Sequence, residues 1–230
     1  MLNNRSLFFL LTLQKKIIMN EQINQYIATH IDPEPRYLYQ IWRETNVTQL
    51  NGRMASGHIQ GRILSLFSNI INPTLAIEIG TFTGYSALCI AEGLQDSGIL
   101  HTFEIDDELE DVIKDNFAKT SISSKISLHI GDATQLIGNM RFTPHSIDFA
   151  FIDADKRQYL EYYTILLPLM KNHGIIIADN TLWSEKIIDD KAKDAQSIAL
   201  RKFNDFVHND LRVSTTILPV RDGMTIIRVL

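Results

Sequence analysis

Acidic side chains and an asparagine follow two apolar segments of this chain. Asp153, Asp155 and Lys156 come directly after IDFAFI, and Asp179 and Asn180 come directly after GIIIA. If the two segments are neighbouring parallel strands, their ends lie about 5 Å apart, and carboxylates held that close repel unless a cation joins them. All the candidate ligands are oxygen atoms, which favours Mg²⁺, Mn²⁺ or Ca²⁺ over zinc. We therefore predict a divalent-cation site here, the alternative being that the aspartates only cap the following turns.

Lys156 is the candidate general base. It follows the first carboxylates within one helical turn, and a lysine beside a cation site loses its proton more readily than a free one. The competing interpretation is an ordinary exposed lysine in the first turn of a helix.

The segment Glu78-Ile-Gly80-Thr-Phe-Thr-Gly84-Tyr-Ser86 is a candidate ligand turn between a strand and a helix. Its glycines allow a tight turn and close approach to a ligand, and the helix that follows offers free N–H groups to an anion. It is not the G-x-G-x-x-G fingerprint of dinucleotide-binding proteins, because position 82 is phenylalanine.

Two further acidic positions point to a nucleoside. Glu104 ends the next apolar segment, 24 residues after Gly80, where a carboxylate accepts the hydroxyls of a ribose. Gly131-Asp132-Ala133 follows the segment after that and could border an adenine, although aspartate there is also a common helix cap. A dinucleotide and S-adenosylmethionine both remain open on these residues alone.

Strands that alternate with helices must position these residues. Such alternation predicts a parallel sheet covered on both faces, and Asp-Gly between the last two extended segments predicts an antiparallel hairpin. The predicted strands are 75–79, 99–104, 126–130, 147–152, 174–178, 213–219 and 225–230, and the predicted helices are 84–95, 107–118, 134–140, 157–171 and 193–209.

The N-terminal part is expected to be helical and to form one domain with the sheet. Residues 20–72 place apolar side chains three and four positions apart, so we predict one domain over 19–230, made of a helical cap (19–72) and a core (73–230). Residues 1–18 read differently, and we interpret them as an extension upstream of a second methionine or a disordered tail, with a weak export signal as the alternative.

The overall composition is that of a globular protein. The 230 residues are 45% hydrophobic and 21% charged, and the net charge is −5. This balance does not indicate general nucleic-acid binding, although it leaves room for a local basic patch. The single cysteine excludes an intramolecular disulfide and a multi-cysteine metal site. Because no segment has the length of a membrane-spanning helix, we expect a soluble, cytoplasmic protein without a membrane partner.

Together these motifs resemble the cation-dependent class I O-methyltransferases, the family of caffeoyl-CoA and catechol O-methyltransferases and their small bacterial relatives. The resemblance covers residues 35–230 and rests on EIGTFTGYSAL (78–88), HTFEID (101–106), GDA (131–133), FIDADKRQY (151–159), ADNTLW (178–183) and LPVRDGMTIIR (218–228). It implies an α/β fold of the Rossmann-like class I methyltransferase type, with a mostly parallel seven-stranded sheet, an antiparallel C-terminal strand pair and an N-terminal helical cap.

The resemblance also implies a role for each motif residue. Lys156 corresponds to the general base, and one divalent cation, usually Mg²⁺, would be bound by Asp153, Asp179 and Asn180. S-adenosylmethionine would be held by Met54, Glu78, Gly80, Thr81, Ser86, Glu104, Asp132, Ala133 and Asp153. Two vicinal hydroxyls of a hydroxylated aromatic small molecule would chelate the cation, which lowers the pKa of one of them. Asp155 is expected near the metal, and a homodimer is implied as well.

The chain departs from the family at two places. The family often has an acidic residue where this chain has Gln60, and residues 184–194 form a shorter stretch than in the plant enzymes, which place acyl-CoA recognition there. A catechol-like small molecule is therefore favoured over a CoA thioester.

Three alternatives remain beside this function. The first is a methyltransferase acting on a hydroxylated wobble uridine of tRNA, for which basic residues near the site could contact phosphate: Lys186, Lys191, Lys193, Arg201 and Lys202. The others are an NAD-dependent oxidoreductase, disfavoured by the missing glycine fingerprint, and a non-catalytic cofactor-binding protein, disfavoured because every metal and base position is filled.

Overall fold

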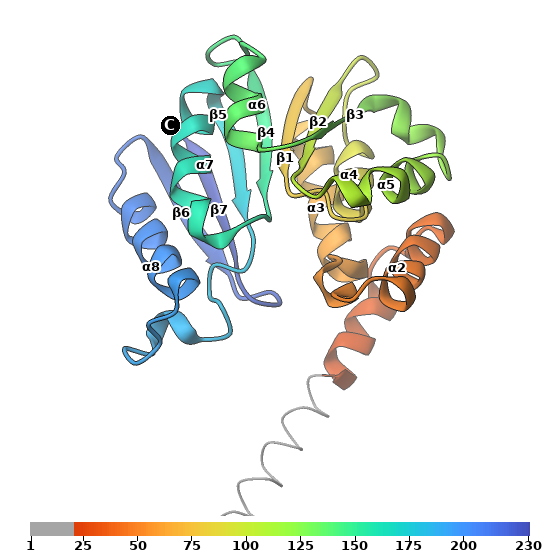
Figure 1. Ribbon diagram of the computed structural model, residues 1–230, viewed down its shortest axis with the longest axis horizontal. Helices are drawn as coiled ribbons and strands as arrows, with labels where there is room; N and C mark the ends of the chain where they lie inside the picture. Colours follow the sequence, from red (N-terminus) through yellow and green to blue (C-terminus); the bar gives the residue numbers. More distant parts are fainter. Residues whose placement is uncertain (1–20) are drawn as a thin grey trace, which may run out of the picture.

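The computed structural model describes residues 21–230 and contains a seven-stranded sheet flanked by helices (Figure 1). The strands lie in the order β3-β2-β1-β4-β5-β7-β6. The first five strands pair in parallel, and β7 is antiparallel to both of its neighbours. The sheet is the one expected from the sequence, including its antiparallel C-terminal pair. The interpretation of residues 1–18 falls outside the described part of the chain.

The strand boundaries follow the apolar segments closely. Four strands begin and end where the sequence predicts: β1 (Leu75–Ile79), β2 (Ile99–Glu104), β3 (Ile126–Ile130) and β4 (Ile147–Ile152). Of the last two, β6 (Val213–Leu218) ends one residue earlier than predicted, and β7 (Met224–Val229) begins and ends one residue earlier. Each of the first four ends at a turn or a polar residue, which is why the sequence marks them so clearly.

The prediction for β5 (Met170–Ala178) was wrong at its start, because the strand begins four residues before Gly174. Its first part is polar, and the pairing with β4 shifts register between Ile147 and Phe149. Lys171 donates to Asp148 of β4 at 2.6 Å, so an ion pair supports an irregular extension that apolar patterning does not reveal.

The helices divide into two groups, one on each face of the sheet. One face carries α3 (Gly57–Ile71), α4 (Tyr85–Ala91) and α5 (Glu110–Phe117), and the other carries α6 (Ala133–Asn139), α7 (Tyr159–Leu166) and α8 (Ala195–His208). Successive strand residues point to opposite faces, so Phe149 and Phe151 pack with the first group, and Ala150 and Ile152 with the second. The predicted helices 84–95 and 157–171 are shorter in the structure, the second because Pro168 lies in a separate short turn, η5 (Leu167–Leu169).

The N-terminal part is helical, as expected, but it is broken into pieces. Residues 21–30 form a helix, α2 (Arg36–Thr48) follows, and the short turn η1 (Gly52–Met54) precedes α3. Pro33 and Pro35 separate the first two helices because a residue before proline avoids the helical conformation. Figure 1 shows α2 lying on the side of α3 and α5, away from α8. The boundary between cap and core at residue 73 remains a prediction.

Between residues 21 and 230, none of the helices combines the length and the apolar character needed to cross a bilayer.

Candidate active site

Two adjoining pockets lie at the carboxyl ends of the parallel strands, where open α/β sheets bind ligands. One has a volume of about 1110 Å³ and is lined by Ser86, Lys156, Asp179 and Asn180; the other, of about 890 Å³, is lined by Glu104, Asp132 and Ala133. The residues that line both pockets form a common wall: Met54, Gly80, Phe82, Asp153, Ala154 and Asp155. Every predicted site residue except Glu78 lines at least one pocket.

Gly80 allows the ends of β1 and β4 to come together at this wall. Its φ is 96°, and a Cβ atom there would lie 2.2 Å from the Asp153 carbonyl oxygen. Backbone hydrogen bonds from Gly80 to Phe103 and from Asp153 to Ile79, both 2.9 Å, hold the ends of three strands in place. Any side chain at position 80 would therefore push Asp153 out of the site.

Glu104 is fixed in the wall of the smaller pocket by backbone donors. Its Oε2 accepts from the N–H groups of Thr81 (3.2 Å) and Phe82 (2.6 Å), and its Oε1 accepts from Asp106 (3.0 Å). Each carboxylate oxygen has a second lone pair, so the side chain is held in place and still has capacity to accept hydroxyl groups.

Asp132 is the N-terminal cap of α6. Its Oδ1 accepts from the Thr134 hydroxyl (2.6 Å) and the Thr134 N–H (2.8 Å), and these bonds lower the pKa of Asp132. The capping interpretation therefore applies to this residue, and it lines the smaller pocket at the same time.

Glu78 lies beneath the pockets and is fully buried. Its Oε2 accepts from the Thr102 hydroxyl at 2.5 Å, which also contacts the Thr81 hydroxyl at 2.5 Å. Its Oε1 has no partner among the described residues. Burial raises the pKa of Glu78 to about 8, although hydrogen bonds from Ser86 and Thr102 act in the opposite direction.

Asp179 and Asp153 end neighbouring strands, and each has one oxygen engaged. Asp179 Oδ2 accepts from the amide of Gln60 at 2.8 Å, whereas its buried Oδ1 has no partner in the part of the chain that the structure describes. Burial, and then the charge of Asp153, raise the pKa of Asp179 to about 6. Asn180 follows with a left-handed φ of 56°.

These residues fit one divalent cation. An unpartnered buried carboxylate oxygen beside a second carboxylate is costly to ionise, and an oxygen-only donor set suits a hard cation such as Mg²⁺. Among residues 21–230, no cluster of three or more His, Cys, Asp and Glu side chains converges on one point. The candidate set is two carboxylates and an amide: Asp153, Asp179 and Asn180.

Lys156 is nearly buried, with 8% of its surface exposed. Its Nζ donates to Asp153 Oδ1 at 2.7 Å and to the hydroxyl of Tyr159 at 2.6 Å. That hydroxyl lies 3.0 Å from the carbonyl oxygen of Asp179. The structure therefore excludes the exposed-lysine interpretation, and it adds Tyr159, a buried residue that the sequence analysis missed.

Asp155 lines both pockets, and its expected place near the metal remains a prediction. Its carboxylate is paired with the Arg157 guanidinium, with Oδ2 to Nη2 at 2.5 Å, and it caps the turn η4 (Lys156–Gln158). Arg157 lowers the pKa of Asp155.

The outer part of the larger pocket is formed by the segment between Asn180 and α8. Trp183, Ser184 and Lys186 line it. Arg201 of α8 holds this segment by donating to four of its carbonyl groups, those of Lys186 (2.7 Å), Ile187 (2.9 Å), Asp189 (2.6 Å) and Ala192 (2.9 Å). Arg201 was considered above for phosphate contact, but its guanidinium is occupied within the protein.

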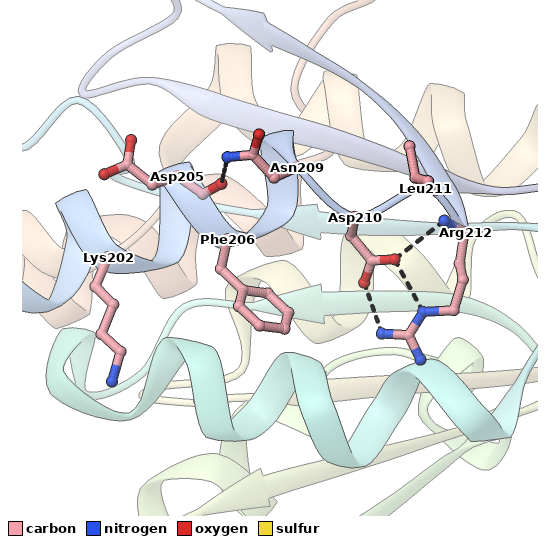
Figure 2. Close-up of a pocket in the computed structure, with 7 residues that line it drawn as sticks. All are labelled: Lys202, Asp205, Phe206, Asn209, Asp210, Leu211 and Arg212. Carbon is pink, nitrogen blue, oxygen red and sulfur yellow. Dashed lines mark hydrogen bonds and ion pairs between the residues drawn. The ribbon is translucent and has the colours of Figure 1, made fainter.

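A further hollow, of about 720 Å³, lies at the C-terminal end of α8 and is separate from the predicted residues (Figure 2). Figure 2 shows Arg212 reaching toward Asp210, and their closest contact is 2.6 Å. The Asp210 carboxylate is therefore neutralised within the protein, and this hollow contains none of the predicted site residues.

Comparison with known proteins identifies the family of this chain. The sequence profile of the O-methyltransferase family matches residues 27–230. A caffeoyl-CoA O-methyltransferase from Stellaria longipes is 34% identical over 223 residues, covering 92% of each chain, and tricin synthase 2 from Oryza sativa subsp. japonica is 30% identical, covering 93% of this chain and 77% of that one.

Solved structures show the same fold. An O-methyltransferase from Bacillus cereus in complex with SAH superposes with a TM-score of 0.84 at 27% identity, over 91% of this chain and 97% of that one. The SAH-bound Podospora anserina methyltransferase PaMTH1 gives 0.83 at 26% identity, over 92% and 95%. The oxidoreductase and non-catalytic alternatives are thereby set aside. The chain belongs to the family of S-adenosylmethionine-dependent O-methyltransferases.

Proposed function

We propose that this enzyme transfers the methyl group of S-adenosylmethionine to a hydroxyl of a catechol-like small molecule and depends on a divalent cation, most simply Mg²⁺. The observation that carries the proposal is the unpartnered, buried Oδ1 of Asp179 beside Asp153 and Asn180. This set opens into the larger pocket, which shares a wall with the pocket of Glu104 and Asp132.

The two pockets divide the cofactor between them. Glu104 would accept the ribose hydroxyls, and Asp132 and Ala133 would border the adenine in the smaller pocket. Gly80, Thr81 and Ser86 would hold the methionine part in the larger one, above the buried carboxyl of Glu78. Met54, from η1, lines both pockets and would close over the sulfonium.

Lys156 would take the proton of the acceptor hydroxyl. A cation bound at Asp153, Asp179 and Asn180 would supply Lewis-acid chemistry, lowering the pKa of a bound hydroxyl. As a neutral amine, Lys156 would accept this proton, and Asp153 and Tyr159 hold its Nζ in place. The remaining contribution of the protein is to orient acceptor and donor.

An aromatic acceptor suits the outer pocket. Trp183 is an aromatic residue of its lining. The Stellaria longipes relative acts on caffeoyl-CoA by its name, and a caffeoyl group carries two vicinal hydroxyls. No observation favours tRNA, because Arg201 is bound internally and Lys186 lies 3.7 Å from Asp194. The homodimer and the cytoplasmic location remain predictions.

The test is an incubation with S-adenosylmethionine and either 3,4-dihydroxybenzoate, caffeate or caffeoyl-CoA, in Mg²⁺ or in EDTA, with product detected by mass. We expect methylated catechol product only with Mg²⁺. The variant Asp179→Asn should lose this activity, whereas Asp205→Asn, an exposed carboxylate in the hollow of Figure 2, should keep it. Equal amounts of product in EDTA and in Mg²⁺ would show that the reaction does not depend on the cation. Product from caffeoyl-CoA but from neither free acid would show that the acceptor is a CoA thioester.

A further inference from the structure

Gln60 reaches the candidate metal ligand Asp179 from the N-terminal cap. It lies on α3, is fully buried, and donates from Nε2 to Asp179 Oδ2 at 2.8 Å across 119 residues of sequence. The next residue is Gly61, where a Cβ would lie 2.8 Å from both Cys89 Sγ and a ring carbon of Tyr85. This close packing of α3 on α4 fixes where Gln60 stands.

Arg221 determines which end of the Gln60 amide faces Asp179. It lies in the β6–β7 turn, and its Nη1 donates to Gln60 Oε1. A guanidinium has donors only, so it must bind the amide oxygen, which directs the amide N–H₂ group to the carboxylate. The reverse orientation would bring donor against donor on one side and acceptor against acceptor on the other.

Arg221 is itself anchored to the segment that precedes α3. Nη1 also donates to the carbonyl groups of Ala55 (3.3 Å) and Ser56, and Nη2 donates to that of Arg53 (3.3 Å). One side chain therefore ties the C-terminal hairpin, the segment around Met54 and the amide of Gln60 together.

From this arrangement we propose that Gln60 and Arg221 are positioning residues for the cation site. Gln60 binds Oδ2 of Asp179 and fixes the carboxylate, whose unpartnered Oδ1 is the oxygen that we assign to the cation, and Arg221 acts through Gln60. The neutral amide does this without adding a third negative charge beside Asp153 and Asp179, which a glutamate at position 60 would add. This inference rests on the proposed cation dependence.

The experiment measures Mn²⁺ affinity of the metal-free enzyme by electron paramagnetic resonance, with SAH affinity and the melting temperature without metal recorded in parallel. Gln60→Met keeps the side-chain length and removes the donor, and Gln40→Met, an exposed glutamine of α2, is the matched control. Outer-shell partners typically change metal affinity about 10- to 100-fold, so we expect a loss of that size for Gln60→Met. Gln40→Met should bind Mn²⁺ like the wild type, and the SAH affinity should be unchanged in both variants. The melting temperature records separately how far the lost buried hydrogen bonds of Gln60 lower the stability.

Arg221 provides an independent arm. Arg221→Met should weaken Mn²⁺ binding less than Gln60→Met does, Arg221→Lys should restore part of it, and the double variant should bind like Gln60→Met alone, because one residue acts through the other. If the wild type binds Mn²⁺ and Gln60→Met binds it equally well, this inference is wrong, whereas the proposed function still stands. Absence of Mn²⁺ binding by the wild type would overturn both.

Discussion

Lys156 is held by Asp153 and Tyr159 at the edge of the candidate cation site, where it would act as the general base. Lys156→Met removes the proton acceptor while keeping the apolar stem. Because general base catalysis contributes about 10²–10⁴-fold, we expect kcat to fall by that order with the SAH dissociation constant unchanged. Single-turnover rates and calorimetric SAH titration measure the two quantities, with the exposed Lys202→Met as the control. A wild-type turnover number would remove Lys156 as the base.

The sequence predicts the residues of this site that end strands, but it does not predict those that reach the site from distant elements. Asp153, Asp179 and Asn180 are visible because they end apolar strands, and strand ends in a parallel sheet converge. Gln60 and Arg221 give no such signal, since their contact joins α3 to a hairpin 161 residues away. Tyr159 was missed for another reason: in the sequence, an aromatic residue of a helix cannot be distinguished from a residue of the hydrophobic core.

The segment between Asn180 and α8 behaves as one element because Arg201 binds four of its carbonyl groups. Arg201→Ala removes the donor to those carbonyl groups, so the segment that lines the acceptor pocket becomes more mobile. We expect the KM for the acceptor to rise by roughly 10-fold, the scale of one or two lost hydrogen bonds, with SAH affinity unaffected. Trypsin should also cut faster after Lys186 or Lys191. Lys202→Ala is the neighbouring control, and an unaltered KM with unaltered cleavage would contradict the role.

At the scale of elements, apolar runs bounded by polar residues determine β1 to β4 so strongly that sequence and structure agree at every boundary. The start of β5 was not predicted because Lys171, Asn172 and His173 are polar. This part of the strand joins the sheet through an ion pair and a register shift. The break between the first two helices of the cap follows from Pro33 and Pro35. The prolines are visible in the sequence, but the helical spacing of apolar residues continues on both sides of them, so the pattern alone does not show where each helix ends.

The stability of the whole molecule should depend on pH through Glu78. Its folded pKa of about 8 lies above the ordinary value of 4.5, so between these values the folded state binds a proton that the unfolded state has released. The free energy of unfolding should therefore fall as pH rises, by about 1.4 kcal/mol per pH unit from this group. Urea unfolding of the metal-free and cofactor-free protein at pH 6 and pH 7 measures this decrease.

The variant Glu78→Gln is neutral throughout and should show a decrease smaller than wild type by about that amount. The exposed Glu161→Gln should behave like wild type. If Glu78→Gln and wild type lose stability in parallel, the buried carboxyl is ionised in both states.

The position of β7 has a consequence for how the chain is made. β7 follows every other strand along the sequence, yet it lies between β5 and β6 in the sheet. During synthesis, the apolar strand Ile175–Ile177 of β5 therefore waits with an open edge until the final hairpin has emerged from the ribosome. An open apolar edge is a template for pairing with another chain. Slow translation or early termination before Met224 should thus yield aggregates rather than a smaller working enzyme.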